Sequence, residues 1–222
     1  MRKIIITIMM FCLLPLLGSC NEALLANSFK RLDRGFTMEC EMEIKLSSRY
    51  INTQYVEVEM FIETSPTEMY SEIEVSGIEE RTYAKINDEE VEIYVYDGKW
   101  IKETISLEDY EDESELAVLD IDLDDFVLED NVWKGNTEIL TEELEYYFKD
   151  MMEDTLGSGT VSHFNVSKYN IEMNGFNISK IDISVDLLAY INGLYVSVEI
   201  DMPMEFSNVG KTKVTVPKGL PE

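Results

Sequence analysis

The sequence predicts an α+β fold, a single curved antiparallel β-sheet (a half-barrel) with helices covering its concave face. Three observations lead to this prediction. Apolar and polar residues alternate along several runs, most clearly in residues 38–46, as they do in strands with one buried face. The dipeptides Asp-Gly and Asn-Gly stand between such runs and favour tight hairpins. Residues 138–153 have the spacing of an amphipathic helix, which must bury its apolar stripe against another layer.

The first set of strands follows a short helical segment. Leucine and phenylalanine recur with a rough helical period in residues 21–34, and Gly35 is a plausible C-terminal stop. The period then changes to two, and strands are expected at 36–46, 55–62, 68–75, 81–86 and 91–95. Strands this short and this closely spaced indicate an antiparallel meander.

An acidic segment separates the two sets of strands. Residues 103–133 contain no lysine or arginine, so we expect an exposed crossing segment with a brief strand near Val132 and Trp133. The predicted helix over 138–153 comes next. Further strands are expected at 164–173, 178–185, 194–202 and 213–217, the last of them stopped by a proline.

The N-terminus has the pattern of an export signal. Arg2 and Lys3 precede an uncharged apolar run, residues 4–17, whose 14 residues would span about 21 Å as a helix. That length is less than the roughly 30 Å hydrocarbon core of a bilayer. We therefore expect a signal that is cleaved and not a helix that spans the membrane.

The end of this run, Leu17-Gly18-Ser19-Cys20, resembles the bacterial lipobox. The resemblance implies that a diacylglyceryl group is transferred to the Cys20 thiol and that the chain is cleaved before it. Residues 1–19 would then be a lipoprotein signal peptide, and acyl chains such as palmitate would anchor the protein to the bacterial cell membrane from outside the cytoplasm. An ordinary secretory signal and an uncleaved anchor are the alternatives.

The mature chain would be strongly acidic and free of disulfides. The full sequence has 45 acidic and 18 Lys or Arg residues, and removal of residues 1–19 would change its net charge from −27 to −29. Such a charge argues against direct contact with nucleic acid or anionic headgroups. Because Cys12 leaves with the signal and Cys20 is acylated, Cys40 would have no partner.

The layout as a whole resembles the LolA/LolB-like lipoprotein-carrier superfamily and the LppX/LprG-type lipoproteins. It comprises a lipobox, a helix or tether in residues 20–35, and a sheet domain in 36–222 with a Tyr-Asp-Gly-Lys-Trp hairpin and late hairpins ending in Val-Pro. The resemblance implies a half-barrel that shelters a lipid or acyl chain. It supplies no invariant functional residue that can be placed on this sequence.

Catalysis is not expected. His163 is the only histidine, has no nucleophile near it in the sequence, and is predicted to be a surface residue. Cys40 shares a strand face with Met38 and Met42 and is flanked by acids, so we expect a core residue and not a reactive thiol. The sequence contains no phosphate-binding loop and no set of metal-ligating His and Cys residues.

A calcium site and a methionine-lined pocket remain as alternatives. Residues 120–125 carry carboxylates at alternate positions as an EF-hand loop does, but they lack its glycine and its final glutamate, so no metal or other cofactor is expected. Methionine adapts to flexible apolar ligands, although it also fills ordinary cores. The apolar lining predicted for such a pocket consists of Met38, Met42, Met60, Leu144, Phe148, Met151 and Val198.

Two functions therefore stay open. One is a membrane-anchored module that binds a lipid or another apolar small molecule in the half-barrel. The other is a surface lipoprotein with a solid core, whose acidic face meets a protein partner that the sequence does not identify.

Overall fold

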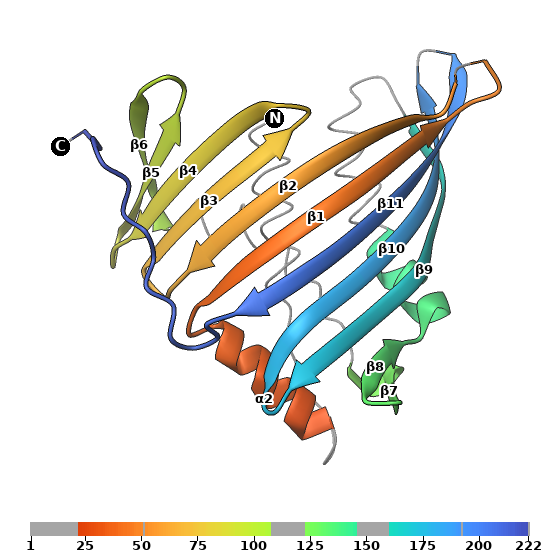
Figure 1. Ribbon diagram of the computed structural model, residues 1–222, viewed down its shortest axis with the longest axis horizontal. Helices are drawn as coiled ribbons and strands as arrows, with labels where there is room; N and C mark the ends of the chain where they lie inside the picture. The colour runs from red at the N-terminus through yellow and green to blue at the C-terminus, as the bar shows by residue number, and fades with distance from the viewer. Residues whose placement is uncertain (1–21, 51, 108–122, 146–159, 192, 222) are drawn as a thin grey trace.

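The computed structural model describes residues 22–50, 52–107, 123–145, 160–191 and 193–221. Its strands form one curved antiparallel sheet in the order β6-β5-β4-β3-β2-β1-β11-β10-β9-β8-β7 (Figure 1). Nearly every strand pairs with its neighbour in sequence, and the pairing of β1 with β11 joins the two meanders. The strands are β1 Phe36–Ser47, β2 Gln54–Thr64, β3 Glu68–Val75, β4 Ile78–Ile86, β5 Glu90–Tyr96, β6 Trp100–Ser106, β7 Phe126–Glu129, β8 Val132–Gly135, β9 Thr160–Asn174, β10 Asn177–Ile191 and β11 Leu194–Ser207.

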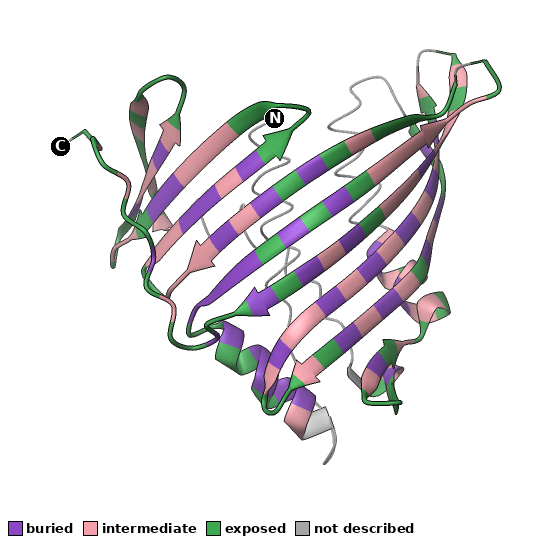
Figure 2. Cartoon of the chain, viewed as in Figure 1, coloured by how far each residue is buried: buried purple, intermediate pink, exposed green. Residues whose placement is uncertain are grey.

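Side-chain alternation gives the sheet two different faces, visible as alternating burial along β1, β2 and β11 (Figure 2). Directly paired residues lie on the same face, so the register traces each face across the strands. We call the face with Met38, Met60 and Ile183 the inner face, and the face with Glu41 and Tyr83 the outer face. The inner face supplies most of the core cluster.

The helix α2, Glu22–Leu32, precedes the sheet and packs at one end of the strands (Figure 1). Leu25, Phe29 and Leu32 are buried in the main core. The Ser28 hydroxyl donates to the carbonyl of Phe176 at 2.8 Å, which ties α2 to the turn between β9 and β10. Gly35 follows with φ +106°, a conformation that favours glycine, and its N–H donates to the Leu32 carbonyl at 2.8 Å.

A second helical segment, residues 137–145, lies beside β9. The Asn136 side chain accepts from the Glu138 N–H at 3.2 Å and so caps its start. Leu140 and Leu144 are fully buried. The Thr141 hydroxyl accepts from the Val166 N–H at 2.9 Å, which fixes the segment to β9. The rest of the predicted helix lies outside the described residues.

The prediction of an α+β half-barrel with helices over its concave face is wrong. The described residues lie mainly in strands, and the two helical segments among them, α2 and residues 137–145, do not cover that face. At 11 residues, α2 is about 16 Å long. Eleven strands about 4.8 Å apart extend roughly 48 Å, so a helix of that length cannot roof them. Its hydrogen bond to the β9–β10 turn holds it at the end of the sheet instead.

Two smaller predictions also need correction. Residues 213–217 do not form a strand but lie in an irregular C-terminal segment that follows β11. The acidic crossing segment is expected from residue 103, yet the edge strand β6 continues to Ser106. The brief strand expected near Trp133 is β8, which pairs with both β7 and β9. Residues 108–122, with most of the acidic side chains of this segment, lie outside the described part of the chain.

Within the described residues, no helix is both long enough and apolar enough to cross a membrane.

Candidate functional site

The structure brings together five of the seven residues predicted to line a pocket. Met38, Met42, Met60, Leu144 and Val198 belong to one buried cluster on the inner face, and none of them is more than 6% exposed. Phe148 and Met151 lie outside the described residues, as does Cys20. The five side chains are packed core residues, so a ligand would have to reach them through the less buried part of this face.

That less buried part lies at the far end of the strands from α2. On the inner face, Ile44 and Leu46 are opposite Val56 and Gln54 on one side and opposite Ile200 and Val198 on the other. Met38, at the α2 end of the same row, is fully buried, whereas Ile44 and Leu46 are only half-buried. The partly buried side chains that continue the cluster in this direction are Ile44, Leu46, Val56, Val196 and Ile200.

The lining predicted from sequence did not include these five residues. Alternation does place them in the same apolar rows as Met42 and Val198, and so on the inner face. Alternation does not reveal how deeply each member of a row is buried. That depends on which segments pack over the row.

The inner face carries further apolar side chains as far as the sheet edge at β6, interrupted by Glu80 and Glu103. Val95 is opposite Thr82 and Ile101, and Ile105 is opposite Val91. Val95 and Ile105 are half-buried, and Ile101 is 38% exposed. The apolar surface of the sheet is therefore wider than its fully buried core.

The outer face of β1, β2, β3 and β11 is acidic. Glu59 lies directly between Glu41 and Glu74, and Glu43 lies between Glu57 and Asp201. All six side chains are exposed, which keeps the carboxylates solvated. Like charges directly opposite each other destabilise a sheet, so the arrangement works against the fold.

An open hollow of about 320 Å³ lies at one end of this acidic region, lined by Tyr55, Glu57, Glu59, Glu74, Ser76 and Gly77. Among the described residues, no group of three or more His, Cys, Asp or Glu side chains is arranged to hold a metal ion. The hollow is accordingly a polar depression in the surface. Of the carboxylates considered from sequence as a calcium site, Asp120 and Asp122 lie outside the described residues, whereas Asp124 and Asp125 lie in a short 3-10 helix.

The outer face of β3, β4 and β5 is aromatic instead. Tyr70, Tyr83 and Tyr94 lie directly opposite one another across the three strands, and all are buried. With Val214 they form a second core cluster, separate from the inner one. This row was not predicted, although each tyrosine occupies an outward position in its strand, with at least one charged residue two positions away.

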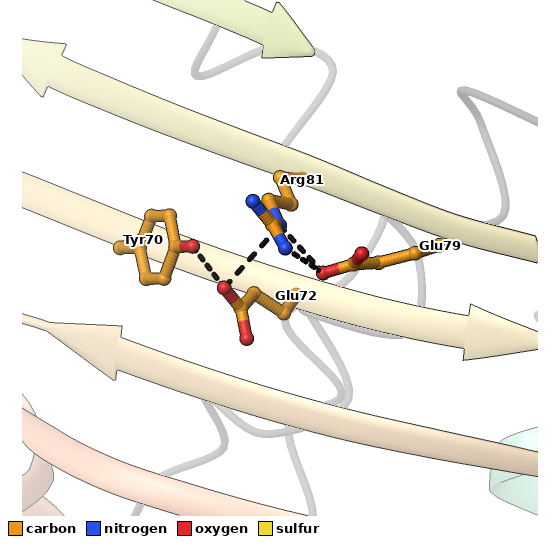
Figure 3. Close-up of polar contacts among 4 residues, drawn as sticks. All are labelled: Tyr70, Glu72, Glu79 and Arg81. Atoms are coloured by element: carbon orange, nitrogen blue, oxygen red, sulfur yellow. Dashed lines mark hydrogen bonds and ion pairs between the residues drawn. The ribbon is translucent and has the colours of Figure 1, made fainter. Parts of the chain in front are cut away.

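Carboxylates next to the tyrosines accept their phenolic hydrogens. Tyr70 donates to Glu72, whose carboxylate also lies 3.4 Å from Nε of Arg81, and Arg81 pairs with Glu79 at 2.5 Å (Figure 3). Tyr83 donates to Glu68 at 2.6 Å. Burial, followed by the bond to the adjacent carboxylate, raises the pKa of both Tyr70 and Tyr83 above the ordinary value. These phenols therefore remain protonated hydrogen-bond donors at any physiological pH.

The two candidate catalytic residues have surroundings that do not activate them. Cys40 is buried on the inner face, and burial together with the charge of Glu41 raises the pKa of its thiol to about 12. A thiol in that state is not a nucleophile at neutral pH. His163 is exposed on β9, as predicted.

Comparison with known proteins adds little to this geometry. No family model matches the sequence, and no curated protein matches it. Among solved structures, the chain is similar to the crystal structure of the ywiB protein from Bacillus subtilis, over 78% of this chain and 94% of that one. The TM-score is 0.25 and the sequence identity 8%, so the likeness carries no argument about fold or function.

Proposed function

We propose that this chain is an extracytoplasmic lipoprotein, anchored through Cys20, that binds a lipid or acyl chain on the inner face of its sheet. Support for the anchor comes from the lipobox-like Leu17-Gly18-Ser19-Cys20. The observation that carries the ligand proposal is the gradient of burial along the inner face of β1, β2 and β11, where the apolar side chains of Ile44, Leu46, Val56, Val196 and Ile200 are only half-buried.

The half-buried residues still have unused apolar surface to offer a ligand. Full burial of an aliphatic side chain contributes about 1.5–3 kcal/mol, and since these side chains are already mostly buried, covering the rest is worth at most about 0.5–1 kcal/mol each. Five such residues, Ile44, Leu46, Val56, Val196 and Ile200, would together supply at most roughly 2.5–5 kcal/mol before association costs, so contacts of the ligand beyond these five must add to the affinity. An acyl chain fits this surface because it needs no hydrogen-bonding partner.

Titration with a fluorescent fatty acid tests the ligand site. The protein is residues 20–222 with Cys20→Ser, which prevents lipidation. We expect V56N and I200N to weaken probe binding at least about tenfold, because each places an amide on the apolar surface. The matched control is S197N, on the outer face of β11, which should leave binding unchanged. Absence of saturable binding to the parent protein would contradict the proposal.

The anchor is tested separately. Mass spectrometry of the full-length protein purified from membranes should find an acylated N-terminal Cys20, and C20A should release the protein from the membrane fraction. An unmodified residue 20, or a different mature start, would exclude the anchor while leaving the ligand proposal intact.

A second function, binding of a basic protein partner, is favoured by the like-charged rows of the outer face. Glu41, Glu59 and Glu74 are aligned across three strands although their repulsion opposes pairing. A cationic partner would relieve that repulsion. If this function is correct, partners captured by cross-linking should be lost in E41Q/E59Q/E74Q, while probe binding on the inner face is retained.

A further inference from the structure

The end of the sheet opposite α2 exposes a group of tyrosines. The β1–β2 loop and the β10–β11 hairpin lie side by side there, because Ser47 pairs with Ser197 (Figure 1). Aromatic surface left in water in such a group marks an interaction site. We define the tyrosine rim by the four side chains, between 41% and 81% exposed, of Tyr50, Tyr55, Tyr190 and Tyr195.

The β10–β11 hairpin is apolar on both of its faces where it meets the rim. On the outer face, Tyr190 is directly opposite Tyr195, and their ring centroids are 5.0 Å apart. On the inner face, the next pair, Ile191 and Leu194, is half-buried. A hairpin with one face in solvent needs apolar side chains on one face only. Apolar side chains on both faces indicate a hairpin whose tip meets an apolar medium.

The sequence around the rim contains no carboxylates. Residues 44–56 and 187–198 have no aspartate or glutamate, although the chain has 45 acidic residues among 222. Arg49 is exposed in the β1–β2 loop. The acidic region of the outer face begins beside Tyr55, at Glu57 and Glu74 in the open hollow. The two hairpins can therefore approach lipid headgroups without desolvating a carboxylate and without the repulsion that the rest of this acidic chain would meet.

The half-buried part of the inner face continues to this rim. Leu46 and Val196 are among the residues proposed to hold the ligand, and Ile191 extends the same cluster to the last pair before the hairpin. In the other direction the face is closed, because Met38 is fully buried and α2 packs against the core. A lipid therefore reaches the inner face from the rim and not past α2.

We propose that the tyrosine rim docks on the interface of a lipid bilayer and that lipid passes there between the bilayer and the inner face. Tyrosine suits this position, because its ring lies at headgroup depth while its hydroxyl stays hydrated. Arg49 supplies a cation for a lipid phosphate. The passage of lipid rests on the proposed function, whereas the docking rests on the rim itself.

The rim and the anchor lie at opposite ends of the sheet. Glu22, where α2 begins, follows Cys20 by two residues, and α2 packs at the far end of the strands. β10 connects the two ends, and its 15 residues span about 50 Å. Docking of the rim is therefore a membrane contact separate from the anchor, and the chain without its anchor can test it.

Flotation of residues 20–222 carrying Cys20→Ser with phosphatidylcholine vesicles tests the docking. We expect the parent to float with the vesicles and Y190S/Y195S to lower its partition coefficient at least about tenfold. Y50S, in the neighbouring loop, should weaken partition as well and tests the rim even if Y190S/Y195S does not fold. The matched control is F176S, because Phe176 is 64% exposed but lies in the β9–β10 turn at the α2 end. A parent that does not float, or an equal loss in F176S, overturns the proposal.

The fluorescent fatty acid separates failure of the docking from failure of the proposed function. Y190S/Y195S should bind the probe in solution as tightly as the parent but take it up from vesicles at least about tenfold more slowly. A parent that binds the probe without floating would overturn the docking alone. A parent that floats without binding the probe would overturn the passage of lipid and the proposed function with it. Light scattering that shows a dimer dissociated by Y190S/Y195S would assign the rim to a second copy of the chain and overturn the proposal.

Discussion

At the scale of single residues, burial controls the chemistry of this protein. Cys40 lies on the inner face between Met38 and Met42, and burial, with the Glu41 charge, moves its thiol pKa from about 9 to about 12. Burial shifts the pKa values of Tyr70 and Tyr83 on the outer face in the same direction. Each group is held in its neutral form by the fold and ionises more readily once the chain unfolds.

This burial predicts a loss of stability in alkali. When folding raises the pKa of a group, the contribution of that group to stability is fully present at a pH below its pKa in the unfolded chain. The contribution is lost as the pH rises through its pKa in the folded protein. The free energy of unfolding should therefore fall between about pH 9 and pH 12, with the Cys40 part reaching about 4 kcal/mol at most. Urea titrations at several pH values measure it. C40A should show a shallower fall, and an unchanged pH profile in C40A would contradict the assignment.

At the scale of elements, the junction between α2 and β1 sets the position of the helix. Gly35 has φ +106°, and a Cβ there would lie 2.3 Å from the Thr64 carbonyl oxygen. Its own carbonyl accepts from the Gly210 N–H at 2.6 Å, so the residue also positions the start of the C-terminal segment. One backbone position thus links the helix, the sheet and the tail.

We expect G35A to be strongly destabilising, by about 3 kcal/mol or more, because both the backbone conformation and the contact with Thr64 oppose a methyl group. The control is G98A in the β5–β6 hairpin, where φ is also positive (+69°) but no atom lies within 4 Å of the added Cβ. That change should lower the free energy of unfolding by only about 1 kcal/mol. Chemical denaturation of the two variants measures the difference, and similar losses would show that the close approach is unimportant.

The elements also show how far sequence reasoning reaches. The strict alternation of apolar and polar residues predicted β1 and β2, because successive side chains of a strand with one buried face point alternately into the core and into solvent. The same reasoning failed at 213–217, where Val-Thr-Val favours a strand but the segment lies across the outer face instead of along a sheet edge. Helical periodicity likewise indicated an apolar stripe without indicating that α2 would be held at the end of the sheet. Contacts between residues far apart in the sequence determine where the C-terminal segment and α2 lie. They also determine which side chains of the inner face are fully buried and which are only half-buried.

At the scale of the whole molecule, the two faces of one sheet have opposite character. The inner face is mainly apolar, and the outer face changes from acidic carboxylates over β1, β2 and β11 to tyrosines over β3 to β5. The two faces of the sheet therefore present different chemistry.

The acidic face predicts a salt-dependent gain in stability on neutralisation. Glu59 is opposed by both Glu41 and Glu74, so E59Q should raise the free energy of unfolding by roughly 0.5–1 kcal/mol at low salt. Added salt should shrink the gain, because it screens the repulsion in the parent. E199Q on β11 is the control. It should lower the free energy of unfolding, because Glu199 forms an ion pair with Lys45 at 2.7 Å. A gain in E59Q that does not change with salt would mean that repulsion is not its source.

Native mass spectrometry of residues 20–222 carrying Cys20→Ser, after incubation with phospholipid micelles and removal of free lipid, tests the central claim most directly. An apolar inner face that remains half-buried predicts one retained lipid per chain, lost in V56N and I200N. A bare chain in every preparation, or lipid retained equally by both variants, would contradict the claim that this face is a binding site.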